Sequence, residues 1–223
     1  MSVSLTVEDV TIDGPVGSLE GLLNTPDGPI ERVALICHPH PLHGGTMHNN
    51  VVYQVARALR ERGLAVLRFN FRGVGRSAGT YDEGRGERDD VRAACDELLR
   101  RFPGRPCWLG GFSFGSRVGL EVGVGDERVS GLIGVGMPVN TWRFAFLEAS
   151  RKPLVAIHGS ADEFGASGVI EGLVANRAAP SRLEMIDGTG HFFTGRFDEL
   201  RAAVDRAADF LVAHELGSLA EEA

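Results

Sequence analysis

The chain has 223 residues, a net charge of −7, and 43% hydrophobic and 24% charged residues. These values are typical of a globular protein with a sizeable core, and the acidic balance argues against a nucleic-acid partner. The sequence has no export signal, no apolar run approaching the ~20 residues of a membrane span, and only three scattered cysteines. We therefore expect a cytoplasmic protein without a membrane partner, while nothing in the pattern predicts an oligomeric state.

Short apolar runs alternate with helical patterns along the chain. Val3, Leu5 and Val7 alternate with polar residues, which is the pattern of a half-exposed strand. Solid apolar runs follow, and they indicate strands that are buried on both faces of a parallel sheet. These runs cover residues 33–37, 65–71, 107–110, 132–136, 154–157 and 183–186.

Amphipathic helices are predicted between and after these strands. One includes residues 52–59 and stops near Gly63, a second includes residues 91–99 with Asp89 and Asp90 near its N-terminus, and a third includes residues 200–211. This alternation predicts an α/β fold that forms one domain over residues 1–223, with residues 215–223 as a frayed tail. The cysteines fall on apolar strand or helix positions and are expected to be buried: Cys37, Cys95 and Cys107.

The strongest chemical motif is "GFSFG", residues 111–115, which lies between a buried strand and a helical pattern. A strand-to-helix turn tight enough to expose one side chain leaves no room for side chains two positions away on either side. Gly111 and Gly115 meet that requirement. Ser113 is therefore the candidate nucleophile, at a helix N-terminus where developing negative charge is favoured.

A serine nucleophile needs a base, and the base needs a group that orients it. Asp162 lies just past the end of one later strand, and His191 follows the next strand in a glycine-rich loop. Both positions fall at the carboxyl edge of the sheet, where open α/β folds bind their ligands. Glu163 is the alternative acid.

The stretches "GFSFG", "HGSADE" and "GTGHFF" resemble the α/β-hydrolase superfamily. "CHPHPLHGGTM" and "LRFNFRGVGRSAGTYDEGRGERDD" resemble its small, capless bacterial branch of esterase-like serine hydrolases related to dienelactone hydrolases. The resemblance covers roughly residues 33–193. It implies a mostly parallel sheet of about eight strands with one antiparallel strand, flanking helices, no cap domain, and a Ser113–His191–Asp162 triad. True dienelactone hydrolases use a cysteine nucleophile, so Ser113 argues against dienelactone chemistry.

An oxyanion hole is expected beside such a triad. In this superfamily one donor is the backbone N–H after the nucleophile, here that of Phe114, and the other comes from the loop after the third strand. Pro39 and Pro41 have no N–H, which favours the amide of His40. Leu42 is the alternative donor.

A metal site and a nucleotide site are the competing interpretations of two other stretches. His38, His40 and His43 could form a metal cluster, but no carboxylate lies between Glu31 and Glu61 to complete it. Residues 73–79 lack the G-x-G-x-x-G spacing of a dinucleotide loop and are predicted to form a turn. We expect no metal and no cofactor.

The segment between the strands that end near Met137 and start near Leu154 is too short for a multi-helix cap. Its aromatic residues Trp142 and Phe146, together with His43, are candidates for the substrate pocket, with core packing as the alternative for the aromatics. The sequence thus predicts a serine hydrolase that cleaves an ester or thioester of a small acyl substrate. The alternatives are a non-catalytic binding protein of the same fold and, less favoured, a metallohydrolase.

Overall fold

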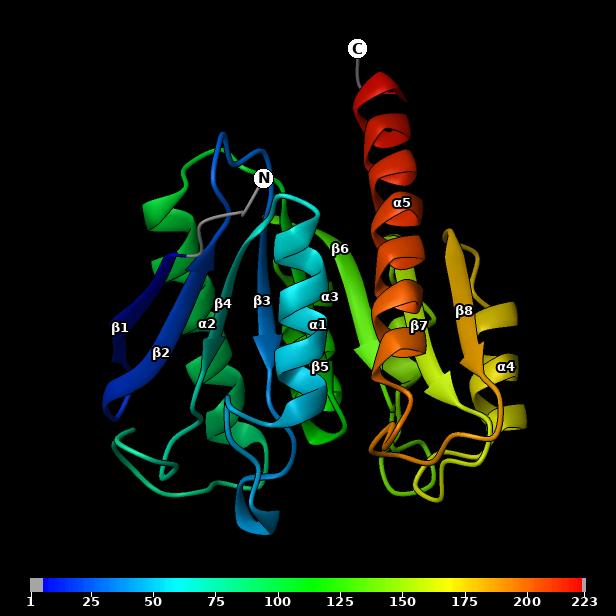
Figure 1. The fold of residues 1–223 in the computed structure, drawn as a ribbon, viewed down its shortest axis with the longest axis horizontal. Coiled ribbons are helices and arrows are strands. Elements are labelled where there is room, and N and C mark those ends of the chain that lie inside the picture. The colour runs from blue at the N-terminus through cyan, green and yellow to red at the C-terminus, as the bar shows by residue number, and fades with distance from the viewer. Residues whose placement is uncertain (1–5, 222–223) are drawn as a thin grey trace.

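A computed structural model describes the backbone of residues 6–221 and the side chains of residues 6–215. Its strands form one sheet in the order β1-β2-β4-β3-β5-β6-β7-β8 (Figure 1). The strands are β1 Thr6–Gly14, β2 Gly17–Thr25, β3 Val33–Cys37, β4 Ala65–Phe69, β5 Cys107–Phe112, β6 Val129–Val135, β7 Leu154–Gly159 and β8 Ser181–Ile186. All neighbouring pairs are parallel except the two that β2 makes, with β1 and β4. The predicted mostly parallel sheet with one antiparallel strand is confirmed.

The predicted strands from β3 onward are present, and β3, β4, β5 and β7 are buried at every position. The period-2 pattern near the N-terminus continues as β1, although Val3 and Leu5 lie outside the described residues. Sequence analysis missed β2, because two of its nine residues are glycines, which weaken a strand pattern. It is held by pairing along the whole of β1 in a hairpin.

Helices cover both faces of the sheet. Helices α1 (Asn50–Glu61) and α5 (Phe197–Glu221) pack on the face that is in front in Figure 1, while α2 (Arg85–Arg101), α3 (Phe114–Gly125) and α4 (Ser167–Ala175) cover the other. Helix α2 begins four residues before Asp89, so Asp89 and Asp90 do not flank its N-terminus as predicted. Glu87 caps this end instead, by accepting from the backbone N–H groups of Asp82 and Gly84.

Helix α5 continues to Glu221, across most of the segment 215–223 that is predicted to be a frayed tail, and residues 222 and 223 lie outside the described residues. Glu215 itself is buried, and its carboxylate accepts hydrogen bonds from the Trp108 indole, the Arg32 guanidinium and the Ser130 hydroxyl. Three donors compensate the cost of burying this charge and hold the helix against the sheet. The cysteines at positions 37, 95 and 107 are buried free thiols, as expected.

The loops that follow the parallel strands meet at one edge of the sheet, at the bottom of Figure 1. We name them the β3 loop (residues 38–49), the β4 loop (70–84), the β7 loop (160–166) and the β8 loop (187–196). Between β6 and β7 the chain forms only the short 3-10 helix η2 (Ala145–Leu147), so the fold has no lid. In the part of the chain that the structure describes, no helix has the length and apolarity needed to span a membrane.

Candidate active site

Ser113 lies at the sharp turn between β5 and α3. Its backbone has φ 55° and ψ −122°, a strained conformation for a residue other than glycine, and its carbonyl accepts from Ser116 in the first turn of α3. A Cβ on Gly111 would lie 2.4 Å from the Gly115 carbonyl carbon, and one on Gly115 would lie 2.4 Å from the His38 carbonyl oxygen. The two flanking glycines therefore give the turn the space that the motif predicts.

His191 connects Ser113 to Asp162 through two short hydrogen bonds. The Asp162 carboxylate lies 2.8 Å from His191 Nδ1, and the Ser113 hydroxyl lies 2.9 Å from His191 Nε2. A carboxylate can only accept, so Nδ1 carries the ring proton and Nε2 accepts from the serine. Asp162 and His191 are both buried, whereas Ser113 is partly exposed. The site is thus a hydrogen-bonded series in which a basic nitrogen faces an accessible hydroxyl.

The β7 loop orients the Asp162 carboxylate. Its Oδ1 accepts from the backbone N–H groups of Phe164, at 2.8 Å, and Gly165, at 3.2 Å, which leaves Oδ2 for the histidine. The alternative acid, Glu163, is exposed, and among the described residues it accepts only from the His191 backbone N–H, at 3.3 Å, rather than from the ring. The geometry therefore favours Asp162 as the group that orients the imidazole.

His158, in β7, is a site residue that sequence analysis missed. It is fully buried, and its Nε2 donates to the Gly165 carbonyl at 2.6 Å, while Nδ1 has no partner among the described residues. The Nε2 atom is also 3.8 Å from Asp162 Oδ2. The ring thereby closes the β7 loop around the carboxylate. A polar residue inside an otherwise apolar strand was the available signal.

His38 begins the β3 loop and is fully buried. Its Nδ1 donates to the Pro39 carbonyl at 2.6 Å, and its Nε2 accepts from the Phe71 backbone N–H at 3.0 Å. Burial lowers the pKa of His38 to about 4, so the ring is neutral at physiological pH. Both nitrogens are bonded to backbone groups, and His38 thereby connects the β3 and β4 loops.

His40 is the second histidine of the β3 loop, and its ring holds two neighbouring segments. The Leu42 backbone N–H donates to Nδ1 at 3.2 Å, which leaves Nε2 as the donor to the Tyr81 hydroxyl, also at 3.2 Å. Burial, reinforced by the nearby His43, lowers the pKa of His40 and so favours this neutral form. The rings of Tyr81 and Phe114 each lie 5.0 Å from that of His40, measured between centroids.

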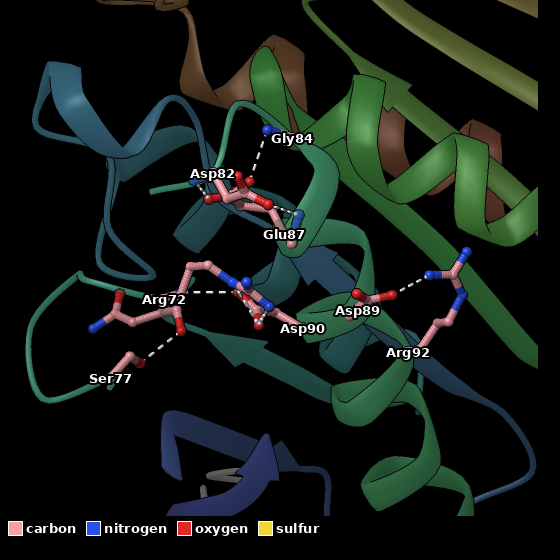
Figure 2. Close-up of polar contacts among 10 residues, drawn as sticks. Arg72, Ser77, Asp82, Gly84, Glu87, Asp89, Asp90 and Arg92 are labelled. Carbon is pink, nitrogen blue, oxygen red and sulfur yellow. Dashed lines mark hydrogen bonds and ion pairs between the residues drawn. The ribbon is translucent and has the colours of Figure 1, made fainter. Parts of the chain in front are cut away.

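The β4 loop that carries Tyr81 is anchored by a buried ion pair (Figure 2). The Arg72 guanidinium faces Asp90 from a distance of 2.7 Å, with side-chain exposures of 8% and 0%. The Arg72 backbone N–H also donates to Asp90, so backbone and side chain are fixed together. A Cβ on Gly86 would lie 1.8 Å from the Arg72 guanidinium, which explains the glycine in the first turn of α2. Residues 73–79 of this loop form the predicted turn.

The backbone amides of His40 and Phe114, both near Ser113, have no acceptor within the described part of the chain. His40 lies between two prolines, and Phe114 is the first residue of α3, whose N–H points out of the helix. The alternative donor, the Leu42 amide, is already bonded to the His40 ring. The two free amides can therefore receive developing negative charge.

A cavity of about 390 Å³ opens over Ser113. The predicted pocket residue His43 lines it, but Trp142 and Phe146 do not. The Trp142 ring packs 6.0 Å from the Phe114 ring, and the Arg117 guanidinium covers Phe146 at 4.7 Å, so both aromatics pack beside the core. The full lining is Pro39, His40, His43, Gly44, Gly45, Asn49, Ser113, Phe164, His191 and Phe192.

The histidines of the β3 loop do not converge as ligands. Within residues 6–215, no group of three His, Cys, Asp or Glu side chains is arranged to hold a metal ion. The ring nitrogens of His38 and His40 are instead engaged with protein groups. The exposed His48 lies next to Asn49, whose side chain caps the N-terminus of α1.

Comparison with known proteins identifies the family. The sequence profile described as "Alpha/beta hydrolase domain" matches residues 34–211. A solved α/β serine hydrolase homologue from Coxiella burnetii is 41% identical, with 90% of this chain and 96% of that one covered and a TM-score of 0.85. A lidless α/β serine hydrolase from Xanthomonas campestris is 36% identical, with 90% and 92% covered and a TM-score of 0.83.

An uncharacterized protein of Rickettsia prowazekii is 33% identical over 212 residues, which cover 91% of this chain and 88% of that protein. The profile match extends from β3 through β8 into α5, and the three relatives each cover 90–91% of the chain. The chain therefore belongs to the α/β-hydrolase family and is a homologue of its serine hydrolases.

Proposed function

We propose that the protein hydrolyses a carboxylic ester or thioester of a small acyl substrate through a Ser113–His191–Asp162 triad. The observation that carries this proposal is the hydrogen-bonded series from the Asp162 carboxylate through the His191 ring to the partly exposed Ser113 hydroxyl. The tautomer fixed by Asp162 leaves Nε2 free to take the serine proton. The serine hydrolase homologues support the choice of a serine nucleophile.

In the acylation step, Ser113 Oγ attacks the acyl carbon and its proton moves to His191 Nε2. The carbonyl oxygen becomes an oxyanion, which accepts from the backbone N–H groups of His40 and Phe114. Each such donor typically contributes about 2.7–4 kcal/mol to the transition state. The tetrahedral intermediate then collapses: the bond to the leaving group breaks, and Nε2 gives its proton to the departing oxygen or sulfur.

Deacylation repeats the sequence with water as the nucleophile. Water gives its proton to His191 Nε2 as it attacks the acyl-enzyme, and that proton returns to Ser113 Oγ when the carboxylic acid leaves. The Asp162 carboxylate stabilises the imidazolium in both halves without taking the proton. In this proposed cycle, His191 accepts and then returns the proton in both steps.

Labelling with an active-site fluorophosphonate tests the nucleophile. Wild type should react and Ser113→Ala should not, while Ser18→Ala, which removes an exposed serine of β2 far from the site, should leave labelling intact. Hydrolysis of a series of p-nitrophenyl esters should disappear with Ser113→Ala alone. Labelling of both wild type and Ser113→Ala would overturn the assignment. A wild type that neither reacts nor hydrolyses any ester would favour the non-catalytic binding protein.

A further inference from the structure

Two exposed phenylalanines flank the proposed base. The ring centroid of His191 lies 4.7 Å from that of Phe164 in the β7 loop and 5.1 Å from that of Phe192 in the β8 loop. Their exposures are 43% and 52%, which is unusual for side chains of this size, and both line the cavity with Ser113. A third ring, that of Phe112, packs on His191 from the buried side and already holds the imidazole. Phe164 and Phe192 therefore have faces available for a ligand.

The chemistry of the proposed reaction places one part of the substrate beside these rings. His191 Nε2 must reach the leaving oxygen to protonate it, so the group attached to that oxygen extends over the surroundings of His191. The acyl carbonyl must instead reach the amides of His40 and Phe114. The two aromatic side chains consequently contact the alcohol part of the ester.

The cavity lining also contains no Asp, Glu, Lys or Arg side chain among its ten described residues. A charged leaving group would lose hydration there without gaining a partner, whereas an aromatic ring can pack against the two exposed rings in edge-to-face or offset geometry. The lining thus favours an uncharged, aromatic group over an ionic one.

We propose that the enzyme prefers uncharged esters of aromatic alcohols, whose ring binds between Phe164 and Phe192 while the leaving oxygen faces His191. This inference rests on the serine hydrolase function proposed above and adds the identity of the leaving group. Phe164 and Phe192 are specificity residues in this view, and the acyl side is the smaller part of the substrate.

An isomeric pair of esters tests whether the two phenylalanines contact the alcohol part or the acyl part of the substrate. Benzyl acetate carries its ring on the alcohol, and methyl phenylacetate carries the same ring on the acyl group. We expect Phe164→Ala and Phe192→Ala each to lower kcat/KM for benzyl acetate about 10-fold, with less than about a 2-fold change for methyl phenylacetate. Comparing each variant with wild type cancels the intrinsic reactivity of the two esters.

Val169→Ala is the matched control, since Val169 is 51% exposed on α4 but does not line the cavity. This variant should leave kcat/KM unchanged for both esters. Equal losses on both esters, or a larger loss on methyl phenylacetate, would overturn the leaving-group assignment. So would a wild type that cleaves cyclohexylmethyl acetate as fast as benzyl acetate, because that result would remove the aromatic preference.

Labelling of Ser113 by diisopropyl fluorophosphate distinguishes this inference from the proposed function. The reagent should still label Ser113 in both phenylalanine variants, and that result would show that the fold and the triad are intact. If wild type is neither labelled nor active on any of the three esters, the serine hydrolase proposal fails and the leaving-group preference fails with it. If Ser113 is labelled but the phenylalanine variants lower kcat/KM equally for benzyl acetate and methyl phenylacetate, only the leaving-group preference fails.

Discussion

The β3 loop and the β8 loop each contain a histidine that is buried and hydrogen-bonded at both ring nitrogens. His38 and His191 are 0% and 3% exposed, yet their partners differ in kind. His38 is bonded to a backbone carbonyl and a backbone N–H. His191 is bonded to a carboxylate and a hydroxyl.

This difference separates a structural imidazole from a reactive one more clearly than burial does. The backbone N–H that faces His38 cannot transfer its proton at ordinary pH, so the ring only fixes two loops together. In the proposed mechanism, the hydroxyl that faces His191 becomes a nucleophile once its proton moves to Nε2. The type of partner, rather than the number of hydrogen bonds, therefore indicates which histidine can perform chemistry.

The largest effect is expected when Asp162, the carboxylate partner of the His191 ring, is replaced. Asp162→Asn should lower kcat for ester hydrolysis about 10⁴-fold, roughly 5 kcal/mol, because an amide no longer selects the tautomer that leaves Nε2 free. Glu163→Gln, next in the chain and exposed, should lower kcat less than about 3-fold. Steady-state kinetics on a p-nitrophenyl ester measures both. A comparable loss in Glu163→Gln would shift the assignment to that residue.

The next prediction concerns the Arg72–Asp90 ion pair. This pair anchors the β4 loop, which in turn contacts the β3 loop. Asp90→Ala leaves the buried Arg72 guanidinium unpaired and should reduce the free energy of unfolding by about 3–5 kcal/mol. The neighbouring pair of Asp89 and Arg92 is exposed (Figure 2), so Asp89→Ala should cost less than about 1 kcal/mol. Urea denaturation followed by circular dichroism measures both values. Equal costs would mean that the Arg72–Asp90 pair has no special structural role.

The pH dependence of stability tests the structural role of His38. Its pKa is about 4 in the folded chain and ordinarily 6.5, so the unfolded chain takes up the proton first. The stability contributed by the neutral ring is complete above pH 6.5 and is lost as the pH falls toward 4, by roughly 3 kcal/mol. Urea denaturation of His38→Asn at pH 7 and pH 4.5 should show a smaller pH effect than in wild type. Parallel pH profiles would contradict the assignment.

The smallest effect concerns Tyr81, which orients the β3 loop through His40. Tyr81→Phe keeps the ring packed on Phe114 and removes only the hydrogen bond to His40 Nε2. We expect kcat to fall about 10-fold, roughly 1.4 kcal/mol, with KM unchanged, because the proposed role of the His40 amide is to contact the substrate oxygen mainly in the transition state. Tyr53→Phe, on an exposed tyrosine of α1, is the control. A rise in KM without a fall in kcat would assign Tyr81 to substrate binding instead.

The sequence by itself determined the alternation of buried strands and amphipathic helices, and the strand–turn–helix around Ser113. These features are local: periodicity reflects burial, and two glycines at fixed spacing reflect the space that one turn requires. Within the loop that the family resemblance implies for the second oxyanion donor, the two flanking prolines favoured the His40 amide. The sequence also placed Asp162 and His191 after successive strands, although it left Glu163 open.

Only the tertiary structure decided which groups face one another. The contacts of His191 join residues 29 and 78 positions apart, and the Tyr81–His40 contact spans 41 positions, distances over which no sequence period operates. The predicted pocket residue Trp142 packs against Phe114, while Phe164 and Phe192 line the cavity instead. The direction of a loop side chain depends on how separate strands converge at one edge of the sheet, and that depends on packing between elements rather than on the pattern within any one of them.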